Sequence, residues 1–204
     1  MAVVFMDHPE QLRNNMKPYL LILFGLAIAT WLSFKHAANG DLKAPSIWIN
    51  ANDTMFERKQ GVVYLDGQPF SGYQFDLYEK KDTAFITPFV NGRESGIAMQ
   101  WYPNKQLKET GKFVNGKKTG EHRGWWESGA IQFSYHFTKD VFEGPVKEWY
   151  ANGQSFRNMN YENGYEKGLQ QIWQPDGSLF ANYEARNGRN YGLTGTMHCK
   201  NYLK

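Results

Sequence analysis

Cysteine is nearly absent from this chain: Cys199 is the only one among 204 residues, so no intrachain disulfide can form. The chain also has no large excess of charge of one sign, because 23 basic and 20 acidic residues leave a net charge of only +3. Nucleic-acid-binding domains concentrate basic residues, so this balance predicts no nucleic-acid partner. The fold must therefore be held by side-chain packing and backbone pairing.

Residues that bind metals or carry out catalysis do not recur with a useful spacing. The five histidines are scattered, and His198 beside Cys199 supplies too few ligands for zinc or copper, which need three or four. The sequence contains no nucleophile elbow, no phosphate-binding loop and no zinc-binding helix motif. We therefore expect no metal, no cofactor and no enzymatic activity.

An uncharged segment lies near the N-terminus, where residues 18–34 read PYLLILFGLAIATWLSF between Lys17 and Lys35. A membrane span needs about 20 apolar residues, with a lower limit near 17. A soluble helix would instead carry a polar stripe, which this segment lacks. The sequence predicts an N-terminal tail over 1–17, a transmembrane anchor over 18–38 and a linker over 39–60.

A cleaved signal peptide is the competing interpretation of this segment. The residues that precede it include the acidic Asp7 and Glu10, and Lys35 and His36 disturb the nearest small-residue cleavage site. These features favour an anchor that is retained. The basic residues on its two sides are nearly balanced, but an N-terminal anchor usually directs a following domain outward. We therefore expect the remainder of the chain to be periplasmic or otherwise extracytoplasmic.

A 24-residue repeat dominates the rest of the chain. Its first column consists of glycines at that interval: Gly72, Gly96, Gly120, Gly144, Gly168 and Gly192. A second column, five residues later, consists of Trp101, Trp125, Trp149 and Trp173, and the residues that follow these are Tyr102, Trp126, Tyr150 and Gln174. Asn-Gly pairs such as Asn115–Gly116 also recur, and they supply the positive φ values that a tight hairpin turn needs.

The residue pattern of each unit predicts a strand, a turn, a second strand and a second turn. Two short strands cannot bury a core alone, whereas stacked units can, so stability should be a sum of unit and neighbour contributions. The sequence therefore predicts an all-β fold over residues 61–204: a single-layer array of repeated β-hairpins, preceded by one transmembrane helix.

The pattern of paired aromatics, Asn-Gly and a later glycine resembles MORN repeats, and in particular the bacterial YwqK-type antitoxin family. The resemblance covers about residues 61 to 200. It departs from the pattern at Asp140, which replaces a turn glycine, and at Leu77 and Met197, which replace tryptophan in the terminal units. The resemblance implies a scaffold or a membrane-proximal adaptor, and the family name implies an antitoxin.

The two aromatic columns have two interpretations. Neighbouring strand residues point to opposite faces, so Trp101 and Tyr102 cannot both enter one core. Both columns pack in the first interpretation, which we favour. In the second, Tyr102, Trp126 and Tyr150 form an exposed ladder that binds a glycan, a peptide or a protein, because an exposed apolar patch often marks an interaction site.

These observations together predict a membrane-anchored β-repeat scaffold that mediates protein–protein interaction at the bacterial cell envelope, with a membrane complex among its possible partners. Two alternatives stay open at this point. One is a secreted or periplasmic module that binds glycan or peptide after signal cleavage. The other is an antitoxin-like binding protein, which would need a cytoplasmic repeat domain.

The anchor generates a first testable prediction. We expect residues 18–34 to be helical and retained in the mature protein, because the cleavage context at Ala37 and Ala38 is poor. N-terminal sequencing of the protein from its native membrane checks this. A mature chain that begins at or after Thr30 would contradict it.

Overall fold

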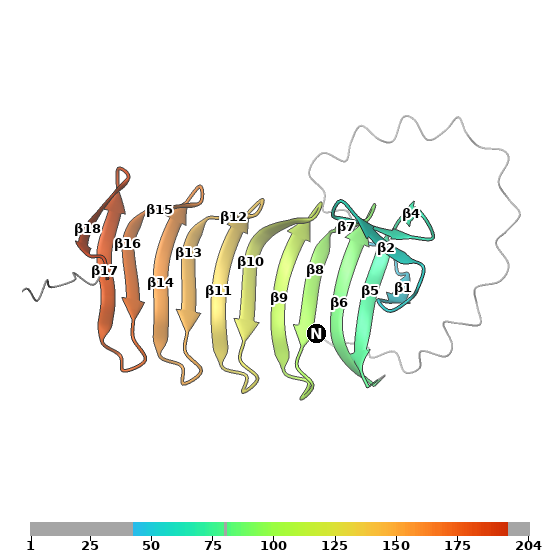
Figure 1. Ribbon diagram of the computed structural model, residues 1–204, viewed down its shortest axis with the longest axis horizontal. Coiled ribbons are helices and arrows are strands. Elements are labelled where there is room, and N and C mark those ends of the chain that lie inside the picture. Colours follow the sequence, from blue (N-terminus) through green and yellow to red (C-terminus); the bar gives the residue numbers. More distant parts are fainter. Residues whose placement is uncertain (1–42, 80, 196–204) are drawn as a thin grey trace, which may run out of the picture. The chain divides into compact units, whose positions relative to one another are not determined.

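The computed structural model describes residues 43–79 and 81–195, and every regular element in these ranges is a β-strand. Most of them form one 15-stranded sheet, and three form a small second sheet. In Figure 1 the long strands of the main sheet lie side by side in a single row that follows the order of the chain. The predicted all-β architecture is confirmed.

The main sheet contains, in spatial order, β1 (Trp48–Asn50), β5 (Gly72–Tyr78), β6 (Asp82–Val90), β8 (Gly96–Trp101), β9 (Leu107–Val114), β10 (Lys117–Trp125), β11 (Ile131–Thr138), β13 (Gly144–Trp149), β14 (Ser155–Glu162), β16 (Gly168–Trp173), β17 (Leu179–Arg186) and β18 (Arg189–Leu193). Three short strands pair at its margin: β7 (Arg93–Glu94), β12 (Val141–Phe142) and β15 (Tyr165–Glu166). The small sheet consists of β2 (Phe56–Lys59), β3 (Val62–Leu65) and β4 (Gln68–Pro69). Among the strands of the described residues, only β1 and β5 pair in parallel.

The tight turns lie where the sequence predicts them. Asn115 and Gly116 have φ values of 50° and 77°, the pair of positive angles that a two-residue hairpin turn requires. Pairs of residues with positive φ also occur at 91–92, 163–164 and 187–188. Lys139 and Asp140 adopt the same conformation without glycine, at 52° and 73°. The repeat therefore imposes this turn even on residues that disfavour it.

The glycines of the first column begin a long strand just after a short marginal one at Gly96, Gly144 and Gly168, whereas Gly120 and Gly192 lie within β10 and β18. Gly144, for example, begins β13 directly after the short β12, and its φ is +77°. All six glycines of the column have a positive φ. Since other residues rarely adopt this conformation, glycine lets the chain leave the short marginal strand and enter the next long one.

The two faces of the main sheet differ in burial. Along β10, His122 and Gly124 are buried whereas their neighbours Glu121 and Arg123 are exposed. The same alternation continues along β13 and β17. We call the face that carries His122 the inner face and the opposite one the outer face. The core of this single layer thus consists of side chains that cover one another on the inner face.

Two buried pairs on the inner face combine a glycine with an aromatic ring. A Cβ on Gly124 would lie 2.1 Å from Cε1 of Phe133, its cross-strand partner. A Cβ on Gly111 would lie equally close to Nδ1 of His122, which is opposite it on β10. Rings that cover a cross-strand glycine recover packing that the glycine itself cannot supply.

The segment over 39–60, expected to be a linker with a short strand around residues 47–49, contains β1 at that place and also β2. Trp48 of β1 stacks on Tyr73 with ring centroids 4.4 Å apart. Next to it, Val63, Phe70 and Phe89 form a buried cluster that joins the small sheet to β6. These residues cover the first strand of the array, so the segment acts as an N-terminal cap.

The predicted tail and transmembrane anchor over 1–38 lie outside the described residues, as do His198 and Cys199. Within residues 43–79 and 81–195, no helix is long and apolar enough to cross a membrane.

The glycine–aromatic pairs generate a second prediction. Gly124 is not in the left-handed region, so Gly124→Ala adds steric overlap without backbone strain. We expect it to lower the free energy of unfolding by about 1–3 kcal/mol, measured by denaturant melts of residues 43–204. In a Phe133→Ala background the same change should cost much less, because the overlapping ring is gone. An equal loss of unfolding free energy with and without the Phe133 ring would contradict the packing of this ring on Gly124.

Candidate functional site

The aromatic residues that follow the tryptophan positions of the repeat form hydrogen bonds to the next unit of the array. We call Tyr78, Tyr102, Trp126 and Tyr150 the aromatic donor column. The hydroxyl of Tyr102 donates to the carbonyl oxygen of Trp125 at 3.0 Å, and that of Tyr150 donates to Trp173 at 2.8 Å. Tyr78 donates in the same way to Trp101, and Nε1 of Trp126 donates to Trp149. Every member therefore ties one unit to the following one.

Exposure does not separate the two aromatic columns. Trp101, Trp125, Trp149 and Trp173 are half-buried, and so are the predicted partner-binding residues Tyr102, Trp126 and Tyr150. The interpretation that both columns pack is consistent with these contacts. Partner binding by Tyr102, Trp126 and Tyr150 stays a prediction, and their hydrogen bonds give them a structural task as well.

A row of aromatic rings crosses the inner face from β9 to β14. His122 is at its centre, 1% exposed, with the rings of Phe113 and Phe137 edge-on at 5.2 and 5.1 Å. The row continues from Phe137 to Phe142 and Tyr161 at 4.6 and 5.3 Å. We call these five residues the aromatic row. Phe113, Phe137 and Tyr161 recur at the 24-residue interval of the repeat, whereas no repeated position singles out His122, which lies two residues after the repeat glycine.

His122 is neutral in this environment. Its Nε2 lies 2.9 Å from the carbonyl oxygen of Lys112, which can only accept a hydrogen bond, so Nε2 carries the proton. Burial lowers the pKa of His122, and the nearby Lys118 lowers it further. The ring therefore serves as a flat, uncharged member of the aromatic row.

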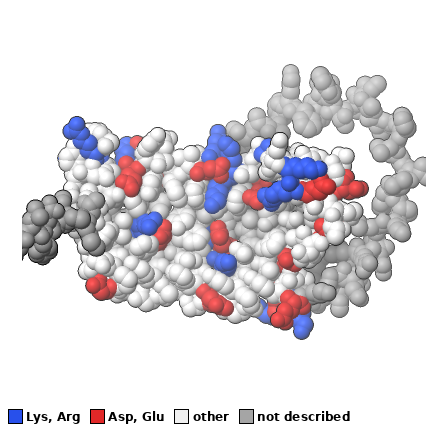
Figure 2. All heavy atoms as spheres, in the orientation of Figure 1, with Lys and Arg blue, Asp and Glu red and all other residues white. Residues whose placement is uncertain are grey.

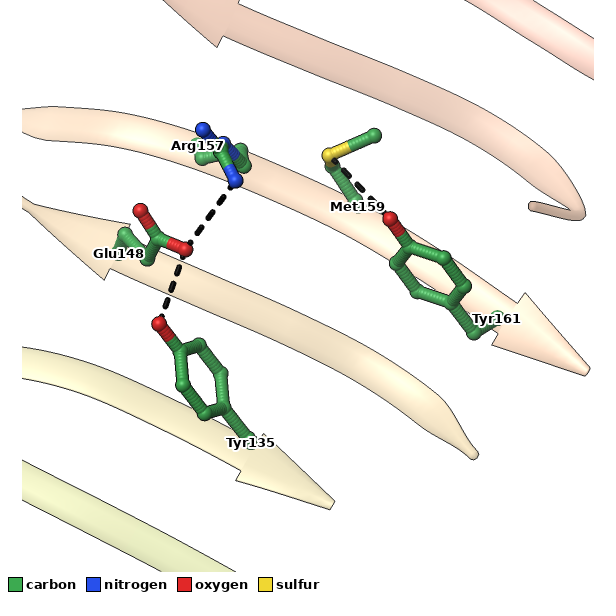
Figure 3. Close-up of polar contacts among 5 residues, drawn as sticks. All are labelled: Tyr135, Glu148, Arg157, Met159 and Tyr161. Carbon is green, nitrogen blue, oxygen red and sulfur yellow. Dashed lines mark hydrogen bonds and ion pairs between the residues drawn. The ribbon is translucent and has the colours of Figure 1, made fainter. Parts of the chain in front are cut away.

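A polar network lies beside the aromatic row (Figure 3). The Tyr135 hydroxyl donates to Oε1 of Glu148 at 2.9 Å, and Nη1 of Arg157 lies 3.4 Å from the same oxygen. Burial raises the pKa of Tyr135, and the Glu148 carboxylate raises it further, so the hydroxyl keeps its proton. The three side chains come from β11, β13 and β14, so the network joins two units.

The row and the network leave one hollow of about 260 Å³ on the inner face over β6, β8 and β9. Ala98 and Gly111 are cross-strand partners and line it with the smallest side chains available. Phe85 and Phe113 contribute aromatic surface, while its polar lining consists of Thr87, Glu94, Gln100 and Glu109. The hollow was not predicted from the sequence, although Ala98 and Gly111 have small side chains at positions where later units of the repeat have larger ones.

A second hollow of about 480 Å³ lies between the last two tight turns. Its lining includes Glu162 and Lys167, which form an ion pair, and Glu166, which accepts a hydrogen bond from Tyr183 at 2.9 Å. Burial and Glu166 raise the pKa of Tyr183 to about 12. The charged groups of this hollow are therefore largely matched within the protein.

Charges on the surface are mixed in sign. Figure 2 shows acidic and basic side chains interspersed among uncharged residues on the face in view. Lys105 pairs with Asp82 at 2.9 Å, and Lys118 lies over the ring of Phe137 at 5.2 Å. No group of three or more residues that could hold a metal ion occurs in the part of the chain that the structure describes.

No protein-family model and no curated protein matches this chain. The resemblance to MORN repeats therefore rests on the residues of the repeat alone.

The aromatic donor column generates a third prediction. Tyr150→Phe removes only the hydroxyl that donates to Trp173, so we expect a loss of about 0.5–1.5 kcal/mol in the free energy of unfolding. Tyr165→Phe is the matched control, because Tyr165 is 79% exposed and should change stability by less than about 0.5 kcal/mol. Denaturant melts of residues 43–204 measure both. Equal effects of the two substitutions would contradict a structural role for the donor column.

Proposed function

We propose that this chain is a membrane-anchored β-repeat scaffold that binds a protein partner at the bacterial cell envelope, through the inner face of its sheet and without catalysis. The observation that supports this proposal best is the inner face itself. In residues 43–79 and 81–195 the small sheet covers this face only at β6, and along the rest of the array no second layer of secondary structure covers it. The aromatic row leaves Phe113, Phe142 and Tyr161 half-buried. Aromatic surface of this kind is typical of protein interaction sites.

The architecture supports a scaffold rather than an enzyme. A stacked array presents one extended face whose side chains vary from unit to unit, while the turns and the donor column repeat. Repeat proteins of this design commonly use such a face for binding. The resemblance to MORN repeats implies the same role.

Attachment to a membrane is supported by the sequence of residues 18–38, which is apolar over the length that a span requires. The repeat domain would then be held near the membrane surface, where a protein in the same envelope is the natural partner. Tyr102, Trp126 and Tyr150 would contribute to binding only with the parts of their rings that the array leaves open.

Photo-crosslinking on the full chain in its native membrane tests the proposal. A benzoylphenylalanine that replaces Phe142 samples the inner face, and the same residue in place of the exposed Lys147 samples the outer face as the matched control. We expect irradiation to give a discrete protein adduct from position 142 and none from position 147. Mass spectrometry then identifies the partner.

Absence of a protein adduct from position 142, or equal adducts from both positions, would contradict binding through the inner face. Retention of the purified protein on cell-wall glycan, without a protein adduct, would favour the secreted binding module instead. A cytoplasmic partner would favour the antitoxin-like alternative.

A further inference from the structure

The hollow over β6, β8 and β9 exists because one unit lacks a large pair of side chains. Three later units fill the corresponding cross-strand position with His122 and Tyr135, Val146 and Met159, or Gln170 and Tyr183. Here the pair is Ala98 and Gly111, and the ring of His122 covers Gly111, so the hollow lies over Ala98 between Phe85 and Phe113. The gap is thus a local departure from a pattern that elsewhere keeps the face filled.

The polar lining of this hollow carries negative charge. Glu94 and Glu109 are half-buried and both line the hollow. Burial raises the pKa of Glu94, and Arg58 and Lys118 are near enough to oppose this only in part. A partly desolvated carboxylate is costly, so a cation that enters the hollow and donates hydrogen bonds to it is favoured.

The size and the walls of the hollow narrow the choice of occupant. Small-molecule sites usually span roughly 300–1,000 Å³, so a volume of about 260 Å³ suits a single side chain. Aromatic faces attract cations, and a planar guanidinium stacks on rings while it donates to carboxylates in a fork. The amide of Gln100 adds an acceptor at the rim.

We propose that this hollow receives an arginine side chain of the protein partner, with its guanidinium on Glu94 and Glu109 and its aliphatic stem along Phe85 and Phe113. This inference rests on the proposed function, because it names the chemistry that the inner face selects. The proposal concerns this hollow and not the one between the last two turns, because the lining of that second hollow already contains the cations Lys167 and Arg186.

The probe for a test is N-acetyl-arginine methylamide, and the protein is the full chain, labelled with 15N-glycine, in detergent micelles. The amide signal of Gly111 reports on the floor of the hollow, and that of Gly188 reports on the second hollow. We expect the probe to shift the Gly111 signal in a saturable manner and to leave Gly188 unchanged. The citrulline analogue, which is neutral and has the same shape, should shift neither signal.

Paired variants test the carboxylates. Glu94→Gln with Glu109→Gln should weaken binding of the probe roughly tenfold or more, since hydrogen bonds to charged groups are lost. Glu166→Gln is the matched control, because it removes an inner-face carboxylate at the other hollow and should leave the Gly111 titration unchanged.

A Gly111 signal that does not move, one that citrulline moves equally, or one that only calcium moves would overturn the inference. Unchanged binding in the paired variant, with both signals otherwise native, would overturn it as well. The proposed function is judged separately by the crosslinks from position 142. A protein adduct that persists undiminished in Glu94→Gln with Glu109→Gln would keep the scaffold function and reject the arginine.

Discussion

Each hairpin of the array depends on hydrogen bonds that its turn residues make to the preceding hairpin. The backbone amide of Gly116 donates to the carbonyl oxygen of Glu94 at 2.8 Å, and the amide of Asn115 donates to the hydroxyl of Ser95 at 3.1 Å. Gly164 repeats the first bond, to Phe142, and Asn163 repeats the second with a carboxylate of Glu143. At the opposite margin the aromatic donor column supplies a third bond per unit. A two-stranded hairpin has little core of its own, so these bonds between units are what make the layer a stable whole.

The turn bonds and the bonds of the aromatic donor column lie at the two margins, and the inner face between them varies from unit to unit. It holds a ring stack around His122, a Tyr135–Glu148–Arg157 network and an acidic hollow, one after another along the same sheet. Gln170 is fully buried there and is matched, because it bonds both the amide and the carbonyl of Asn160. The repeated bonds at the margins are thus distinct from the variable inner face, to which we assign the proposed recognition.

Local conformation was predictable from the sequence, whereas the side-chain surface was not. Asn115–Gly116 and the glycine column require positive φ wherever they occur, so turns and strand breaks followed directly from residue type. The face of each side chain depends on the register, and the register shifts at a bulge just before Trp101, Trp125, Trp149 and Trp173. The capping strand β1 pairs in parallel with β5 over a separation that no local signal reveals. The hollow depends on which side chains face one another across β6, β8 and β9, so it was not predicted from the sequence.

Hydrogen exchange of the turn amides measures the bonds between units directly. In a two-residue hairpin turn the amide of the second turn residue has no partner within its own hairpin, so only the neighbouring unit can protect it. The account predicts slow exchange at Gly92, Gly116, Asp140 and Gly164, whose amides donate to Phe70, Glu94, Lys118 and Phe142. Gly188 should exchange fast, because its amide has no such backbone acceptor within the described residues. Equally fast exchange at all five amides would contradict the claim that each unit is held by its neighbour.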